Sequence, residues 1–218
     1  MYFASRLQAG RMLAEQLVPK YQGKPCAVLA LGDGGVMVGA QIASKLHCVL
    51  TMLSSGEIML PREPDPIAGI TSNGVVTYNS RYSDGEVNEM RSEYFGLIEQ
   101  EKLQQMHDLN HVRGGGGTIR KDLLKGRWVI VVSDGLKTGF PVDLVNEFLK
   151  PIQIEGMVIA VPFAGVRAVD RMHLLADDLY CMNVLADYID TDHYYDKQDV
   201  PDHETVLTTM EHISARWQ

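Results

Sequence analysis

The sequence predicts an α/β protein with one parallel sheet of about five strands, helices on both faces and a small antiparallel flap. Short runs of β-favouring apolar residues without polar alternation are typical of strands buried on both faces. Helical patterns alternate with these runs along the chain. A length of 218 residues and a hydrophobic fraction of 45% suit one well-buried domain. We expect a single domain over residues 1–218, with the flap at about 54–80.

The first part of the chain indicates a helix followed by a β-α-β unit. The expected elements are a helix over 3–17, a strand over 27–31, a helix over 36–46 and a strand over 49–53. Pro19 should end the first helix. Gly32-Asp33-Gly34-Gly35 follows the first strand and opens the second helix. Two strands joined in this way run parallel, with a right-handed crossover.

The flap and the segment after it differ in character from the rest. Two short apolar runs flank Asn73-Gly74, a pair typical of a hairpin with a type I′ turn. Asp84 is expected to cap one long helix whose apolar stripe continues to Leu109. The stripe around Tyr94 and Phe95 could pack in the core or against a second copy, so a homodimer is compatible with it. Gly114–Gly117 indicates a loop after this helix.

The most informative stretch runs from Trp128 to Pro141. Four apolar residues predict a central buried strand, a polar turn containing two glycines follows, and Pro141 is typical of the first turn of a helix. Ligands of parallel α/β sheets bind at such strand ends. Beyond it, the pattern predicts strands over 157–162 and 179–185, a helix over 166–176 and a capped helix near Asp202.

The turn after this strand is a candidate phosphate cradle. Thr138 and Gly139 stand where backbone N–H groups and a hydroxyl can converge on a phosphate at a helix N-terminus. Asp134 is the candidate catalytic residue, placed at the strand tip within reach of sugar hydroxyls, and Lys137 could reach a phosphate or remain solvated. The candidate substrate-binding residues are Ser133, Asp134, Gly135, Leu136, Lys137, Thr138, Gly139, Asp33, Gly34 and Gly35.

This turn resembles the ribose 5-phosphate loop of type I phosphoribosyltransferases, and the similarity to predicted bacterial members of that family extends over almost the whole chain. The stretches that carry it are 3–14, 30–36, 61–69, 129–139, 194–196 and 202–206. The resemblance implies a phosphoribosyltransferase fold and a phosphorylated ribose or nucleotide as the ligand. It also implies phosphoribosyl transfer to a base or other small nucleophile, with magnesium accompanying phosphoribosyl pyrophosphate.

The departures from the family fall at positions that would contact the reacting groups. Its members usually carry Arg where this chain has Asp33, an Arg-Lys pair where it has Gly56-Glu57, and an acid where it has Ser133. Pyrophosphate departs with several negative charges, so enzymes surround it with cations. Asp33 and Glu57 would oppose that charge. Two unit charges ~4 Å apart interact by roughly 4 kcal/mol at an effective dielectric of 20.

Three functions stay open from the sequence. The first is an active phosphoribosyltransferase, and the second is a catalytically silent member acting as a nucleotide-binding sensor or interaction subunit. The third is phosphorolysis or hydrolysis at the anomeric carbon, where fewer negative charges depart. Fold alone does not choose among them.

Composition excludes several other classes. The formal net charge of −8 argues against a nucleic-acid binder. No signal pattern or membrane-length apolar run is visible, so we expect a cytoplasmic location and no membrane partner. Three distant cysteines indicate neither disulfides nor zinc, and His107 with His111 lacks a third ligand. No metal site is assigned, and the acidic cluster Asp187, Asp190, Asp192 and Asp196 is expected to be a solvated loop.

Overall fold

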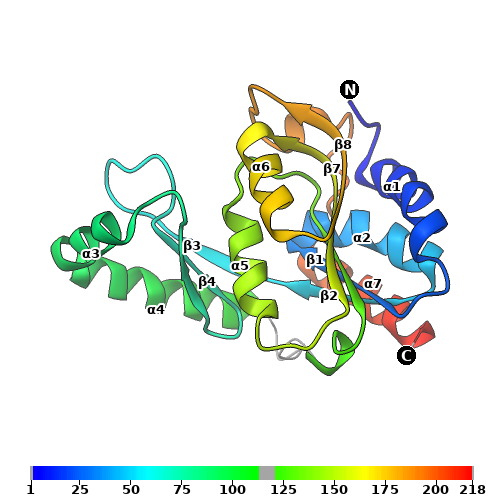
Figure 1. Ribbon diagram of the computed structural model, residues 1–218, viewed down its shortest axis with the longest axis horizontal. Helices are drawn as coiled ribbons and strands as arrows, with labels where there is room; N and C mark the ends of the chain where they lie inside the picture. The colour runs from blue at the N-terminus through cyan, green and yellow to red at the C-terminus, as the bar shows by residue number, and fades with distance from the viewer. Residues whose placement is uncertain (1, 113–120, 218) are drawn as a thin grey trace.

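The computed structural model describes the backbone of residues 2–112 and 121–217 and the side chains of residues 2–110 and 121–217. Its centre is a five-stranded sheet in the order β2-β1-β6-β7-β8, with every neighbouring pair parallel (Figure 1). The strands are β1 (Cys26–Leu31), β2 (Val49–Leu53), β6 (Trp128–Val132), β7 (Gly156–Gly165) and β8 (Asp178–Leu185). The predicted fold class is confirmed.

Helices cover both faces of this sheet (Figure 1). One face carries α1 (Arg6–Tyr21), α2 (Gly32–Leu46) and α7 (His203–Arg216), and the other carries α5 (Phe140–Leu149) and α6 (Val166–Leu175). Within β1, Val28 and Ala30 join the first core, whereas Ala27 and Leu29 join the second, and all four are fully buried. Both faces of the strand are therefore apolar, which explains the absence of polar alternation.

A second, antiparallel sheet forms the flap in the order β3-β4-β5. Its strands are β3 (Ser55–Ile58), β4 (Ala68–Thr71) and β5 (Val76–Tyr78), and they pack with α3 (Asp84–Glu93) and α4 (Phe95–Val112) into a lobe beside the main body (Figure 1). A Cβ atom on Gly69 would lie 2.9 Å from Leu144, so β4 lies directly on α5. That contact joins the lobe to the main body.

The hairpin between β4 and β5 is confirmed, but its type I′ turn is wrong. A type I′ turn needs positive φ at both central residues, and here Gly74 has φ of 84° whereas Asn73 is not in that region. The N–H of Thr71 donates to the carbonyl of Val75 at 2.9 Å, and its hydroxyl bonds the Asn73 side chain. These bonds favour a three-residue turn with one left-handed glycine.

The long helix predicted from Asp84 is two helices, and its cap is Ser83. The Ser83 hydroxyl accepts from the N–H of Glu86, and the Glu86 carboxylate accepts from the N–H of Ser83 at 2.8 Å. The helix breaks at Tyr94, although Tyr94 still donates to Met90 and Ile98 to Tyr94. The apolar stripe continues through the break because this bonding is nearly uninterrupted, so its spacing did not predict the break.

Pro19 does not end the first helix, because α1 continues to Tyr21. A proline near the end of a helix removes only one backbone hydrogen bond. Tyr21 is fully buried and its ring packs edge-on against Trp128 at 5.6 Å between centroids. Burial of this large ring stabilises the last turn more than the missing bond costs.

The expected loop at 114–117, the homodimer and the cytoplasmic location are not tested by the fold. Residues 114–117 lie outside the described ranges. None of the helices in the described part of the chain is long and apolar enough to cross a membrane. In α4, Phe95 and Leu103 are strongly exposed. The homodimer and the cytoplasmic location both stay predictions.

The close contact of α1 with α2 gives a test of packing. A Cβ atom on Gly10 would lie 2.5 Å from the carbonyl oxygen of Val38, so Gly10→Ala forces two helices apart. We expect a loss of about 1–3 kcal/mol in the free energy of unfolding, measured by urea titration. Gly96→Ala is the matched control, since a Cβ there meets nothing within 4 Å. Equal stability of the two variants would contradict this packing.

Candidate functional site

The loop from Ser133 to Gly139 joins β6 to α5 at the carboxyl edge of the sheet. The N–H of Leu136 donates to the carbonyl of Phe163 at 3.2 Å, and the carbonyl of Leu136 accepts from Gly165 at 2.8 Å. The hydroxyl of Ser133 donates to the carbonyl of Gly135 at 2.9 Å. The loop is thus fixed to the end of β7. Its first half, at Ser133, Gly135 and Leu136, lines one cavity, and its second half, residues 137–139, lines two others.

The second half of the loop presents free backbone N–H groups. Among the described residues, no hydrogen-bond acceptor is found for the N–H groups of 137–140, and the N-cap residue of α5, Gly139, provides no side-chain cap. Thr138 and Arg167 line two cavities on this side, of 150 and 370 Å³. Arg167 is exposed at the start of α6. Free donors, a hydroxyl and a cation therefore share one face of the loop.

Glycine at position 139 allows the starts of α5 and α6 to approach closely. A Cβ atom there would lie 2.4 Å from the Cβ of Arg171. The guanidinium of Arg171 in turn donates to the carboxylate of Asp143, which also accepts from the hydroxyl of Ser80 at 2.7 Å. Asp143 is 4% exposed. This ion pair, with a buried carboxylate and a partly exposed guanidinium, joins α5, α6 and the flap beside Thr138.

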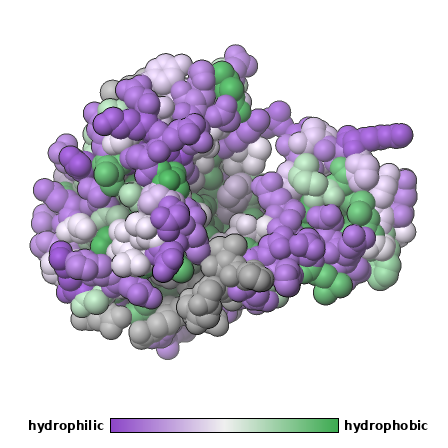
Figure 2. Space-filling view, turned by 180° about the vertical axis from the view of Figure 1, so that it is seen from behind, coloured by the Kyte–Doolittle hydropathy of each residue, from purple (hydrophilic) through white to green (hydrophobic). Residues whose placement is uncertain are grey.

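The first half of the loop faces a larger cavity of 440 Å³. Ser133, Gly135 and Leu136 line it together with Asp33 and His203, and Ser54, Ser55 and Leu109 close it from the side of the lobe. Figure 2 shows the surface hollowed between the main body and the lobe. Asp33 at the start of α2 bonds His203 at the start of α7, with 2.8 Å between Oδ1 and Nδ1. Sequence reasoning missed His203 because its partner is 170 positions away.

The side chain of Asp134 points to Arg6 and away from the 440 Å³ cavity. Its carboxylate accepts from Nε of Arg6 at 2.8 Å, its carbonyl accepts from the hydroxyl of Tyr195 at 2.6 Å, and it does not line the 440 Å³ cavity. Burial raises the pKa of Asp134, and the ion pair with Arg6 opposes that rise. A catalytic role for Asp134 stays a prediction, with its carboxylate committed to Arg6.

Arg6 is the centre of a cluster that the sequence did not predict. Its side chain is 3% exposed and forms ion pairs with Asp134, Asp192 and Asp199, the last at 3.6 Å. Its guanidinium also lies 4.4 Å from the ring centre of Tyr195. Burial lowers the pKa of Arg6, but the bonds to Asp192 and Asp134 outweigh this and hold it above its usual range. Asp192 is therefore an ion-pair partner, although its side chain is 52% exposed. Asp187, Asp190 and Asp196 are exposed as well, as expected for a solvated loop.

The departures from the family have local structural reasons. A Cβ atom on Gly56 would lie 2.1 Å from Oε1 of Gln105, because α4 packs directly on β3, so the Gln105 side chain occupies the space that a side chain at position 56 would need. Asp33 is held by His203, as above. No group of three or more histidine, cysteine, aspartate or glutamate side chains gathers at a metal-binding distance among the described residues.

Three further charged side chains, those of Lys137 and of Glu63 and Asp65 in the flap segment, have protein partners. Lys137 donates to the carbonyl of Ile189 at 3.4 Å, and Asp65 forms an ion pair with Arg81. Glu63 accepts from the hydroxyl of Tyr82 at 3.1 Å. The side chain of His111 lies outside the described residues. Each partner limits how far these charges can move toward a ligand.

Comparison with known proteins bears on the family. No family model matches the chain. A Mycobacterium tuberculosis protein named "Putative phosphoribosyl transferase", in strains CDC 1551 and H37Rv, is 28% identical over 182 residues. The match covers 83% of this chain and 40% of that protein, so the chain spans less than half the length of these curated relatives. The predicted resemblance to phosphoribosyltransferases is confirmed.

Solved structures bear on the fold. The protein TT1426 from Thermus thermophilus superposes with a TM-score of 0.74 at 25% identity, over 98% of this chain and 100% of that one. A hypoxanthine phosphoribosyltransferase from Staphylococcus aureus gives a TM-score of 0.48 at 14% identity, over 86% and 78% of the two chains. The Thermus structure thus shares the fold from end to end.

The ion pair of Arg6 with Asp134 gives a test of the cluster. Arg6→Ala leaves a buried carboxylate without its partner, so we expect a loss of about 3–5 kcal/mol in the free energy of unfolding at pH 7. Without Arg6, burial alone acts on Asp134 and raises its folded pKa above the unfolded value. The loss should therefore shrink as the pH falls from 7 toward about 4, the unfolded value for Asp.

Urea titrations at several pH values measure this effect. Arg6→Ala combined with Asp134→Asn is the control, because it removes both charges and should recover part of the loss at pH 7. A destabilisation by Arg6→Ala that does not change with pH would contradict the ion pair.

Proposed function

We propose that the chain is a phosphoribosyltransferase-like protein that binds the 5-phosphate of a ribose on loop 133–139, as part of a nucleotide or of phosphoribosyl pyrophosphate. The observation that carries the proposal is the start of α5, where the N–H groups of 137–140 have no acceptor among the described residues. Free N–H groups and the helix dipole both favour a phosphate there. The names of the curated relatives support the same ligand class.

The surroundings of this loop also favour an anion. Arg167 and Thr138 line both cavities beside the free N–H groups, and Lys137 lines the larger of them. A charge-assisted bond to phosphate is about twice as strong as a neutral one. Asp143 and Arg171 neutralise each other and leave Arg167 as the cation best suited to a phosphate ligand.

Transfer from phosphoribosyl pyrophosphate is less well supported. The leaving pyrophosphate carries several negative charges, and Asp33 would face it from the start of α2. Gly56 and Glu57 stand where the family usually carries a pair of cations. We therefore favour a family member that binds nucleotides and is catalytically silent toward that donor.

Magnesium is the cofactor expected with phosphoribosyl pyrophosphate. The described residues do not fit a protein-bound ion well, because Asp33 is engaged by His203 and Asp134 by Arg6. A carboxylate oxygen that is already bonded to a protein group is less available as a magnesium ligand. Magnesium would reach this site as part of the ligand, held by its phosphates.

Isothermal titration with ribose 5-phosphate, nucleoside monophosphates and phosphoribosyl pyrophosphate, each with and without magnesium, tests the proposal. Thr138→Ala should weaken monophosphate binding about 10- to 100-fold, the range for a hydrogen bond to a charged group. Binding of monophosphates that is unchanged in this variant would show that the cradle is misassigned.

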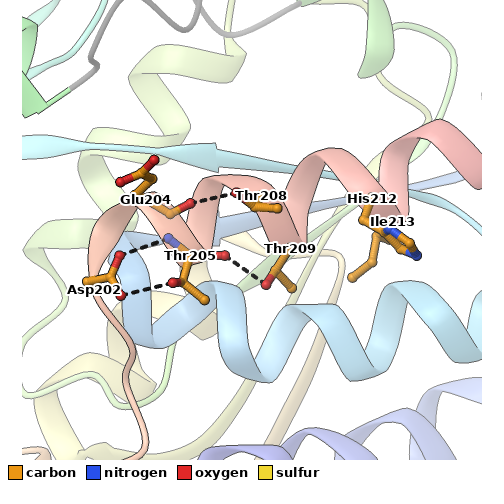
Figure 3. Close-up of a pocket in the computed structure, with 7 residues that line it drawn as sticks. All are labelled: Asp202, Glu204, Thr205, Thr208, Thr209, His212 and Ile213. Carbon is orange, nitrogen blue, oxygen red and sulfur yellow. Dashed lines mark hydrogen bonds between the residues drawn. The ribbon is translucent and has the colours of Figure 1, made fainter.

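Thr208→Ala is the matched control, since it removes the same atoms from the exposed face of α7 (Figure 3). The Thr208 hydroxyl donates only to the carbonyl of Glu204, four residues earlier. Its affinity should equal that of the wild type. Release of pyrophosphate from phosphoribosyl pyrophosphate on addition of a free base would contradict the catalytically silent role.

A further inference from the structure

Asp33 and His203 are hydrogen-bonded to each other in the wall of the 440 Å³ cavity. The proposed phosphate cradle does not use them. His203 is the first residue of α7 and Asp33 the second of α2, with 2.8 Å between Nδ1 and Oδ1. Their side chains are 24% and 33% exposed, and both line the cavity. The pair is thus open to a ligand and held in one orientation.

A histidine held in this way can transfer a proton. A carboxylate that accepts from Nδ1 fixes the tautomer and the ring orientation, leaving Nε2 as the nitrogen that can take a proton. This arrangement contains the histidine and the aspartate of a serine–histidine–aspartate triad, and water can take the place of the serine. In the cavity the polar neighbours are small hydroxyls, Ser54, Ser55 and Ser133.

The pair also lies beside the proposed ribose site. Strands β1 and β6 are neighbours, and the loops that follow them touch: a Cβ atom on Gly34 would lie 2.0 Å from the Asp134 carboxylate, and one on Gly35 would lie 3.0 Å from the carbonyl of Val132. The loop that presents Thr138 at one end lines the cavity of His203 at the other. A ribose bound by its phosphate at Thr138 would therefore share one loop with the Asp33–His203 pair.

We propose that Asp33 and His203 form a proton-transfer pair that lets water cleave the N-glycosidic bond of a nucleoside 5′-monophosphate. His203 is the catalytic base, and Asp33 is a positioning residue. The inference rests on the proposed binding of a ribose 5-phosphate at loop 133–139.

The step balances without a further reactant. The water oxygen bonds to the anomeric carbon as the carbon–nitrogen bond breaks, and that electron pair leaves on the base. Nε2 of His203 takes the water proton and later returns it to solvent, from which the leaving base takes a proton. The products are ribose 5-phosphate and the free base.

The charge of Asp33 agrees with this leaving group. Near a departing pyrophosphate, a carboxylate adds repulsion, whereas a departing nucleobase carries at most one negative charge, which is removed by a proton. The same carboxylate stabilises the imidazolium that forms on His203. The residue that disfavours pyrophosphate transfer therefore favours hydrolysis.

The full chain, incubated with AMP, GMP, IMP, CMP and UMP, should release free base and ribose 5-phosphate from at least one of them, measured by liquid chromatography. His203→Gln should lower kcat at least 100-fold, the scale of general base catalysis. Its affinity for the same nucleotide, by isothermal titration, should stay within about threefold of the wild type.

Asp33→Asn tests the positioning role. It keeps a hydrogen bond but loses the negative charge, so kcat should fall with little change in KM, and Asp33→Glu should restore part of kcat. A purely structural pair would instead lower Tm and raise KM in both variants. That pattern would overturn the inference.

His212→Gln is the matched control for His203→Gln. His212 lies on the same helix, α7, on the exposed face shown in Figure 3 and away from the 440 Å³ cavity. It should leave base release unchanged. Wild-type protein that binds nucleotides but releases no base overturns this inference and leaves the proposed function standing. Wild-type protein that binds none of them overturns both.

Discussion

The buried guanidinium of Arg6 is the interaction on which the arrangement of the site depends. It joins the start of α1, the loop after β6 and the tail around Asp192 and Asp199, segments that lie far apart in the sequence. Taking a charge out of water is costly, so such a group persists only when its partners are held in place. Since it holds Asp134 on one side, Ser133 and Gly135 face the cavity on the other.

Close backbone approach then sets what the two ends of the site can do. Gly34 and Gly35 allow the loops after β1 and β6 to touch, and Gly139 allows the starts of α5 and α6 to touch. One end consequently offers free N–H groups beside Arg167, and the other offers the Asp33–His203 pair. A ligand with a phosphate at one end and an uncharged group at the other suits this distribution better than a bisphosphorylated donor.

Packing inside the lobe sets the space around position 56. Where α4 lies on β3, the Gln105 side chain occupies the space that a side chain at position 56 would need. A longer side chain at position 56 would have to displace the Gln105 side chain, so the residue at position 56 and the packing of the lobe are linked. Fold alone does not fix function, so the charges at these positions have to be read beside the fold.

The sequence by itself determined the fold class, the order of strands and helices, and the strand–loop–helix unit that carries Thr138 and Gly139, because these follow from local patterns of burial and turn chemistry. Local pattern misplaced the ends of helices at Pro19, Ser83 and Tyr94, where packing of distant side chains decides. Only the tertiary structure decided that Asp134 is bound by Arg6 and Asp33 by His203. Those partners are 128 and 170 positions apart, and a one-dimensional pattern carries no information about which distant charges folding brings into contact.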